Sequence, residues 1–215
     1  MKNIKNIKIV TIMLFATAAI YTILVKTIDV QAIGPKGSFV GFATINNYFH
    51  QILKTNDFWY KATKYLGVVP FLYVFFYGIV GLKQLIKYKC LEKIDKKILI
   101  LGGFYLVVGI VYFFFEKVII NYRPILENGT LEASYPSSHT MLAICVCLSS
   151  IFMNTYYIKN NSLKKVLNIA TWILMILLVL GRLLSGVHWF TDILGGVIIS
   201  LFLVFSFYMF CQKLK

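Results

Sequence analysis

Long apolar stretches separated by short polar connections are the main pattern of this 215-residue chain. Six stretches approach or exceed the roughly 20 residues that an α-helix needs to cross a bilayer. A soluble core would not need so many long uninterrupted apolar runs, so the pattern predicts an all-α, polytopic membrane protein with six transmembrane helices. The expected spans are Ile7–Val25, Leu66–Ile86, Lys97–Phe115, Thr140–Ile158, Val166–Leu184 and Ile193–Cys211.

The polar connections contain no low-complexity linker, and we expect a single domain over residues 1–215. The longest connection, residues 27–65, mixes turn residues with aromatic side chains and lysines. This composition suits a segment in the membrane interface, either as a lid over a site or as an anchor for the first two helices. Within it, Gly34-Pro35-Lys36-Gly37 is interpreted as a bare turn, because no P-loop lysine and hydroxyl follow it.

Charge is divided unequally between the two ends of the expected bundle. The chain is 14% charged with a formal net charge of +14. With both termini on one side, that side carries fourteen of the 22 basic residues and only two of the eight acidic ones. The positive-inside rule then puts both termini of this multi-pass protein of the cell membrane in the cytoplasm, and residues 116–139 and 182–192 on the extracytoplasmic side. Because orientation accounts for the charge, no nucleic-acid partner is expected.

The four cysteines indicate neither a disulfide framework nor a zinc site. Cys145 and Cys147 lie within the fourth span, and Cys90 and Cys211 lie near the cytoplasmic side, where thiols stay reduced. No cluster of ligand residues has metal-binding spacing. We therefore expect no metal and no cofactor.

The most informative polar residues follow the fifth span. His188 and Asp192 are four residues apart, so on a helix they would share one face and the carboxylate could hold the imidazole. Such a carboxylate fixes the histidine tautomer so that the attacking nitrogen has a free lone pair. Arg182, six residues upstream of His188, suits an anionic substrate.

A second histidine comes with a helix start. Pro136 can sit at the beginning of the fourth span, which would put Ser137, Ser138 and His139 in a first turn whose free N–H groups attract anions. A phosphate ester could lie between this turn, Arg182 and the cations Lys117 and Arg123. His188 would attack phosphorus, and His139 would protonate the leaving oxygen and then activate water.

These residues form three motifs that resemble those of the type 2 phosphatidic acid phosphatase family, which includes bacterial undecaprenyl pyrophosphate phosphatases. The family patterns are Lys-x6-Arg-Pro, Pro-Ser-Gly-His and Ser-Arg-x5-His-x3-Asp. Here they appear as Lys117-x5-Arg123-Pro124, Pro136-Ser137-Ser138-His139 and Gly181-Arg182-x5-His188-x3-Asp192. The resemblance is specific within residues 117–192 and implies the helical-bundle core that this family shares with vanadate haloperoxidases. It implies catalytic roles for His188, His139 and Asp192, and phosphate binding by Lys117, Arg123, Ser137, Ser138 and Arg182.

Three departures from the family patterns affect the expected site. Lys117 is one residue closer to Arg123 than the pattern requires, and Glu116 occupies the lysine position. One residue on a helix turns a side chain by about 100°. Ser138 replaces glycine but keeps its backbone N–H, and Gly181 replaces serine, which removes one hydroxyl contact to phosphate. These departures leave an inactive relative as an alternative.

The leading hypothesis is a membrane lipid phosphatase that acts on the outer leaflet through a phosphohistidine. Undecaprenyl pyrophosphate, phosphatidylglycerol phosphate and phosphatidic acid are the candidate substrates, and the short loops favour the polyprenyl pyrophosphate. The expected partners are this lipid phosphate and the surrounding membrane lipids; the sequence gives no oligomeric state. A lipid phosphotransferase of the same family is one alternative. A transporter or scaffold is another, although the chain has no convincing internal repeat and its ionisable residues cluster at one face.

Overall fold

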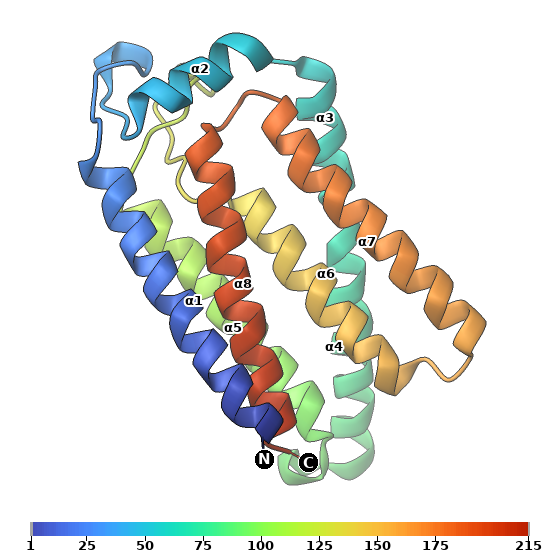
Figure 1. Cartoon of the computed structure of the whole chain (residues 1–215). Coiled ribbons are helices and arrows are strands. Elements are labelled where there is room, and N and C mark those ends of the chain that lie inside the picture. The colour runs from blue at the N-terminus through green and yellow to red at the C-terminus, as the bar shows by residue number, and fades with distance from the viewer. Residues whose placement is uncertain (1, 215) are drawn as a thin grey trace.

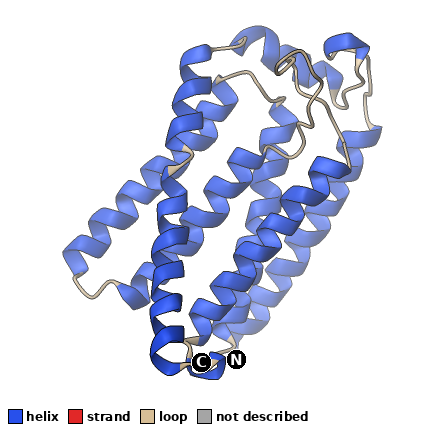
Figure 2. Cartoon of the chain, turned by 180° about the vertical axis from the view of Figure 1, so that it is seen from behind, coloured by secondary structure: helices blue, strands red, loops and turns tan. Residues whose placement is uncertain are grey.

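The computed structural model describes residues 2–214 as a bundle of helices joined by loops at its two ends (Figure 1, Figure 2). The long helices are α1 (Lys2–Thr27), α4 (Val69–Tyr88), α5 (Lys96–Lys117), α6 (Ser138–Tyr157), α7 (Asn161–Leu184) and α8 (Phe190–Gln212). The shorter elements are α2 (Ala43–Leu53), α3 (Asp57–Leu66) and the 3-10 turns η1 (Pro35–Gly37) and η2 (Leu91–Lys93).

The predicted membrane helices are confirmed. Within residues 2–214, six segments are long and apolar enough to cross a bilayer, and they coincide with the six expected spans to within a few residues at most ends. One boundary differs: residues 57–65, which were expected in the connection before the second span, are helical. They form α3, which continues through Gly67 into α4, so the apolar segment extends over Asp57–Tyr88.

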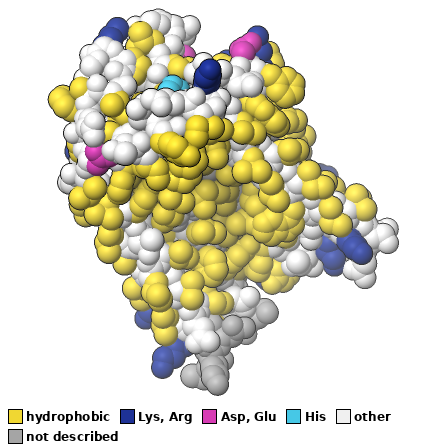
Figure 3. Space-filling view, turned by 45° about the horizontal axis from the view of Figure 1, so that its top comes forward, with side chains coloured by type: hydrophobic (Ala, Val, Ile, Leu, Met, Phe, Trp, Pro, Cys, Tyr) yellow, Lys and Arg dark blue, Asp and Glu magenta, His cyan; other side chains and the backbone are white. Residues whose placement is uncertain are grey.

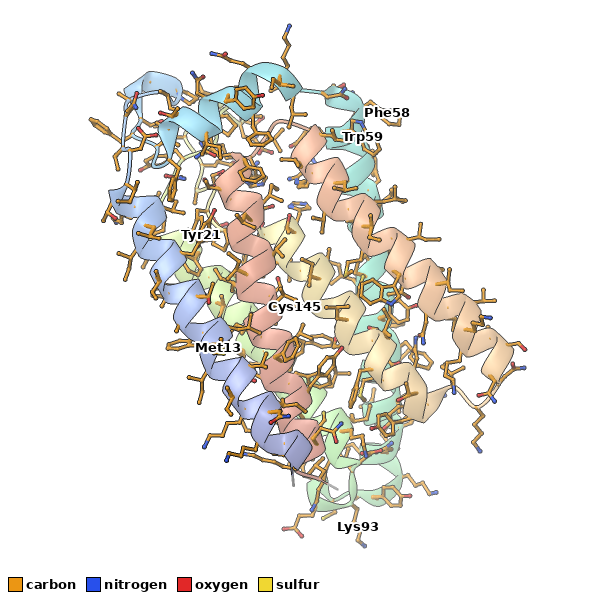
Figure 4. The ribbon with its side chains drawn as sticks, in the orientation of Figure 1. Met13, Tyr21, Phe58, Trp59, Lys93 and Cys145 are labelled. Atoms are coloured by element: carbon orange, nitrogen blue, oxygen red, sulfur yellow. The ribbon has the colours of Figure 1, made fainter. Side chains whose placement is uncertain are left out.

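Helices α6 and α8 form the centre of the bundle. α1 packs along one side of α8, α6 lies between α7 and α8, and α4 and α5 pack against α6 (Figure 1). Cys145 of α6 is fully buried in the middle of the molecule, whereas Met13 of α1 is 63% exposed on its outer side (Figure 4). Hydrophobic side chains cover much of the outer surface (Figure 3), as a protein surrounded by lipid requires.

The two ends of the bundle differ in their loops. Both termini lie at one end, together with Lys93 of η2, and Phe58 and Trp59 of α3 lie at the other (Figure 1, Figure 4). The loops that precede α6 and α8 lie at this second end, opposite the termini (Figure 1). The motif segments therefore meet at one end of the bundle, as predicted from the number of spans.

The segment before α3 covers the loop end of the bundle. α2 lies across it (Figure 1), and Asn46 exchanges two hydrogen bonds with Thr191 at the start of α8, with distances of 2.8 and 3.1 Å. Phe49 stacks on Phe190 with ring centroids 4.3 Å apart. Lys36 of η1 donates through Nζ to the Gly129 carbonyl oxygen at 3.0 Å. η1 is thus a turn, as predicted, and the whole segment is tied to the loops around the motif residues.

Candidate active site

His188 does not share a helix with Asp192. α8 begins after it, at Phe190, with Trp189 as the N-cap, and the Asp192 carboxylate accepts the Trp189 backbone N–H at 3.0 Å. The prediction that the two side chains share one helical face was therefore wrong. Asp192 caps its own helix, where an acidic group near the N-terminus is favourable. Its contact with His188 is indirect.

Ser134 lies between these two side chains. Its Oγ is 3.0 Å from His188 Nδ1 and 2.5 Å from Asp192 Oδ2. Asn121 donates through Nδ2 to the other carboxylate oxygen at 3.2 Å. Neither Ser134 nor Asn121 was found in the sequence analysis, because Asn121 is an unspecified position of the first motif and Ser134 lies in the loop outside the three motifs. Their proximity to Pro136 and Arg123 was the only local signal.

The hydrogen bonds of His188 define its tautomer. Nδ1 lies 3.1 Å from the Ser134 backbone carbonyl oxygen, which can only accept, so Nδ1 carries the proton. Nε2 then has the lone pair, and it is buried without a hydrogen-bond partner. Burial, followed by the charges of Arg123 and Arg182, holds the pKa of His188 well below its usual value. The imidazole is consequently neutral at physiological pH, the form that can attack phosphorus.

His139 lies in the first turn of α6 and contacts Arg182 from α7. Arg182 Nη2 is 3.2 Å from His139 Nδ1, and because a guanidinium can only donate, this nitrogen accepts. The proton of neutral His139 is thus on Nε2, where it can donate a hydrogen bond to a phosphoryl or leaving oxygen. The two histidines have opposite tautomers: Nε2 has the free lone pair in His188 and carries the proton in His139.

Arg182 is a buried cation without a carboxylate partner. It is 1% exposed and forms no ion pair among the described residues. Its other contacts come from α3: Thr63 Oγ1 at 3.3 Å and the ring of Tyr60, whose centroid is 5.4 Å from Cζ. Its Nε is buried and unpaired. Sequence reasoning missed this contribution of α3, since it treated residues 57–65 as interfacial.

Gly181 has a different role from the one expected. A Cβ atom at this position would lie 2.7 Å from Thr63 Cγ2 and 3.0 Å from Trp59 Cε3. A side chain at this position would therefore point towards α3, and its absence allows α3 to approach α7 closely. The expectation that Gly181 removes a phosphate contact was wrong in this structure, because a serine side chain here would meet α3 first.

Arg123 is held by two acidic side chains of its own loop. It forms ion pairs with Glu127, through Nη1, and with Glu132, through Nη2 at 3.4 Å. Tyr60 donates its hydroxyl to Glu127 at 2.8 Å. Partial burial raises the pKa of Glu127, but the bonds from Tyr60 and Arg123 outweigh it and the net shift is downward; burial raises the pKa of Glu132. The Nε of Arg123 is buried with no partner.

The two serines of the second motif have different contacts. The Ser137 N–H donates to the Asp192 backbone carbonyl at 3.0 Å, so this N–H is already used, but Ser137 Oγ is buried and unpaired. Ser138 lines two adjoining cavities, one with His188 and the other with His139. Because it lines both cavities, Ser138 lies between the two histidines. The first-turn N–H groups that follow Ser137 have no intrahelical acceptor and are free to bind an anion.

The structure does not bring Lys117 to the other candidates. Its side chain is exposed at the end of α5 and lines none of the described cavities, whereas Glu116 lines the cavity that contains His188. The one-residue shift thus has the geometric effect expected of a helix, and nothing in the structure supports Lys117 as a phosphate ligand. A lysine absent from the motifs, Lys64 of α3, lines the cavity that contains His139.

The site as a whole has the character of an anion-binding site. Two arginines from different segments, two neutral histidines and a helix start converge at one end of the bundle. Four buried polar atoms of these residues have no partner in the protein: Arg123 Nε, Ser137 Oγ, Arg182 Nε and His188 Nε2. Buried polar atoms are almost always paired, so a group of four at one place indicates a polar ligand. No group of three or more His, Cys, Asp or Glu side chains within residues 2–214 has a metal-binding arrangement.

Comparison with known proteins agrees with this fold and arrangement. The chain belongs to the PAP2 superfamily, whose family model matches residues 37–215. The family membership predicted from the three motifs is therefore confirmed.

Two relatives from Bacillus subtilis are similar to this chain. Phosphatidylglycerophosphatase B of strain 168 is 31% identical over 101 residues, which cover 46% of this chain and 49% of that protein. The match thus extends over about half the length of this relative. The crystal structure of a transmembrane PAP2 type phosphatidylglycerolphosphate phosphatase covers 95% of this chain and 97% of its own, with a TM-score of 0.61 and 21% identity. The latter likeness establishes the fold, and the predicted six-span helical-bundle class is confirmed.

Proposed function

We propose that this protein is a membrane lipid phosphatase that hydrolyses a phosphomonoester or pyrophosphate of a lipid through a phosphohistidine on His188. The single observation that carries the proposal is the set of unpaired buried polar atoms on Arg123, Ser137, Arg182 and His188. A phosphoryl group supplies acceptors for the arginines and the serine, and an electrophile for the free lone pair of His188 Nε2. The family and both relatives support the sequence prediction of a membrane lipid phosphatase.

An apolar cavity next to His139 supports a lipid substrate. Its volume is about 260 Å³, and its polar lining residues are Thr63, Lys64, Ser138 and His139. Phe71 lines it and is 49% exposed on the outer surface, so the cavity extends from the site towards the lipid-facing side of the bundle. The remaining lining is mostly apolar and comes from residues around the start of α4 and from α5, α6 and α7: Gly67, Val68, Pro70, Tyr112, Leu142, Ala143, Val146 and Leu178. A lipid chain fits such a surface, and a free sugar phosphate would leave it unused.

The proposed reaction has two steps, in which His188 is the nucleophile and His139 carries the proton. Beside the anionic substrate, His139 takes up a second proton and enters the first step as imidazolium. His188 Nε2 attacks phosphorus, the bond from phosphorus to the leaving oxygen breaks, and this oxygen takes the Nε2 proton of His139, which becomes neutral. A water molecule then gives a proton to Nε2 of neutral His139 and attacks the phosphohistidine, releasing phosphate and restoring both His188 and the imidazolium. The buried arginines stabilise the negative charge that spreads over the phosphoryl oxygens in both steps. Neither step of this reaction requires a metal ion.

The direction of the site relative to the cell is part of the proposal. The loop end that holds the histidines is opposite the end with the termini (Figure 1). Fourteen of the 22 lysines and arginines belong to the terminal end, which supports a cytoplasmic location for it and an extracytoplasmic site. Outer-leaflet lipid phosphates are then the natural substrates. The names of the two relatives make phosphatidylglycerol phosphate the first lipid to test, beside undecaprenyl pyrophosphate and phosphatidic acid.

The test is phosphate release by purified protein in detergent from these three lipids, with water-soluble phosphomonoesters as the comparison. We expect turnover of at least one lipid, retention of most of the rate after thorough chelation, and inhibition by vanadate. His188→Ala should abolish release, and wild-type protein quenched with labelled substrate at alkaline pH should hold an acid-labile phosphoenzyme. Wild-type turnover by His188→Ala would exclude His188 as nucleophile, and a rate that disappears on chelation and returns with magnesium would exclude the metal-free mechanism.

A further inference from the structure

The hydrogen bonds around His188 have a direction that fixes the role of Ser134. The carboxylate of Asp192 only accepts, so the Ser134 hydroxyl, 2.5 Å from Oδ2, donates its proton to Asp192. The same oxygen is 3.0 Å from His188 Nδ1, which carries a proton because it also faces the Ser134 carbonyl oxygen at 3.1 Å. Ser134 Oγ thus accepts from His188 and donates to Asp192. The chain of contacts is imidazole to hydroxyl to carboxylate.

The surroundings hold this chain of hydrogen bonds in place. Ser134 is 2% exposed and Asp192 is fully buried, so water does not compete for their contacts. The Ser134 backbone N–H donates to the Asn121 carbonyl oxygen at 2.9 Å, and Asn121 Nδ2 donates to Asp192 Oδ1. The next residue, Tyr135, is anchored to α1 by a 2.8 Å hydrogen bond between its hydroxyl and Thr22 Oγ1. Asn121 and Tyr135, which flank Ser134, are therefore held by contacts that do not involve the Ser134 side chain.

We infer that Ser134 is a positioning residue that transmits the charge of Asp192 to His188 during phosphoryl transfer. This inference rests on the proposed function, since it concerns the same nucleophile. When Nε2 bonds to phosphorus, the ring gains positive charge while Nδ1 keeps its proton. The hydroxyl oxygen, polarised by Asp192, then accepts a stronger hydrogen bond from Nδ1–H, and this bond stabilises the charged ring. No proton leaves Nδ1 or Ser134, and the extra charge disappears when water cleaves the phosphohistidine.

This arrangement separates two tasks that a directly paired carboxylate would perform together. The Ser134 backbone carbonyl sets the tautomer, and it remains when the side chain is changed. The Ser134 hydroxyl supplies the charge contact alone. Removing the hydroxyl should therefore lower kcat and leave substrate binding, which depends on Arg123 and Arg182, largely unchanged. We expect a loss of about 10- to 100-fold, by analogy with the loss seen when a partner that orients a metal-bound histidine is removed.

The test is a double-mutant cycle on the detergent-solubilised full chain, with kcat and KM measured on the lipid phosphate that the wild type hydrolyses. Ser134→Ala should lower kcat at an unchanged KM, and Ser134→Thr, which keeps a hydroxyl, should recover part of the loss. Asp192→Asn should lower kcat in the wild-type background but cause little further loss in the Ser134→Ala background, because its route to His188 is already interrupted. Ser200→Ala removes another buried hydroxyl, 2.5 Å from the Gly196 carbonyl within α8, and should leave kcat unchanged.

Several outcomes would refute the inferred role of Ser134 between Asp192 and His188. Wild-type kcat in Ser134→Ala, or losses that multiply in the double variant, would show that Asp192 reaches His188 by another route. If Ser134→Ala does not fold, Ser134→Cys keeps the size with a weaker donor and should give a reduced kcat; a wild-type value there would refute the inference. A wild type inactive on every lipid phosphate would instead refute the proposed function, so the two failures are distinguishable.

Discussion

Replacing Arg182 by methionine should separate two effects of this buried charge, its effect on the stability of the protein and its contribution to phosphate binding. Arg182 is 1% exposed, forms no ion pair in the described part of the chain, and has one buried nitrogen with no partner. Methionine has a similar length and no charge. Arg182→Met should leave the empty protein about as stable as the wild type, while phosphate binding and turnover collapse.

The magnitudes follow from the contacts of the guanidinium. Burying an ion costs several kcal/mol. The Tyr60 ring returns about 2 kcal/mol or less, and the bonds to Thr63 and His139 return about 1.5–3 kcal/mol each. Because these terms nearly cancel, the free energy of unfolding of the empty protein should change by no more than about 2 kcal/mol, or about 4–8 °C in the unfolding midpoint. In the transition state the lost charged donor should cost about 100- to 1,000-fold in kcat/KM.

Thermal unfolding in detergent, with and without vanadate, measures both effects. At 100 times its dissociation constant, vanadate should stabilise the wild type by about 2.7 kcal/mol. The same concentration should leave the midpoint of Arg182→Met unchanged. Lys117→Met is the matched control: it removes an exposed cation that lines no described cavity, so it should keep both the vanadate shift and the activity. A large drop in the midpoint of empty Arg182→Met with a normal vanadate shift would make Arg182 structural and refute the reasoning.

Three further predictions concern orientation, packing and pH. In a cysteine-free background, a membrane-impermeant thiol reagent applied to intact cells should label an exposed cysteine at Thr130 and spare one at Asn161; the reverse labelling would put the histidines in the cytoplasm. Gly181→Ser should lower the unfolding midpoint through a destabilisation of about 1–3 kcal/mol, because its Cβ would meet Thr63 at 2.7 Å, whereas a serine at Gly103, with open space around it, should not. Since the pKa of His188 is depressed in the folded protein, the unfolded chain takes up its proton first as pH falls, so stability should be lost below about pH 6.5; in His188→Gln this part of the loss should be absent, and an identical decline would contradict it.

The order of the motifs on the membrane could be read from the sequence because it depends on local properties. A run of about 20 apolar residues must be a helix in lipid, where backbone polar groups have no water to bind. The number of runs then puts residues 116–139 and 182–192 at one end of the bundle, where the structure has them. The motif spacing identified His139, Arg182 and His188 as neighbours, and Arg182 does contact His139.

The contacts that decide the chemistry depended on packing between segments distant in the chain. Spacing alone suggested a direct pair of His188 and Asp192, but the start of α8 falls between them and Ser134 from another loop fills the gap. Residues 57–65 looked interfacial from their composition, yet Gly181 lets them pack on α7 as α3 and bring Tyr60 to Arg182.

The sequence by itself thus determined the membrane class, the six helices, the family and the candidate histidines, because hydrophobic length and motif order are properties of the chain. The tertiary structure alone decided which groups touch them: Ser134 between His188 and Asp192, Glu116 in the cavity where a lysine was expected, and two glutamates on Arg123. The physical reason is that a hydrogen bond is made or lost over less than 1 Å and tens of degrees. That precision is set by where helices begin and how closely they pack, and neither is encoded in the spacing of a motif.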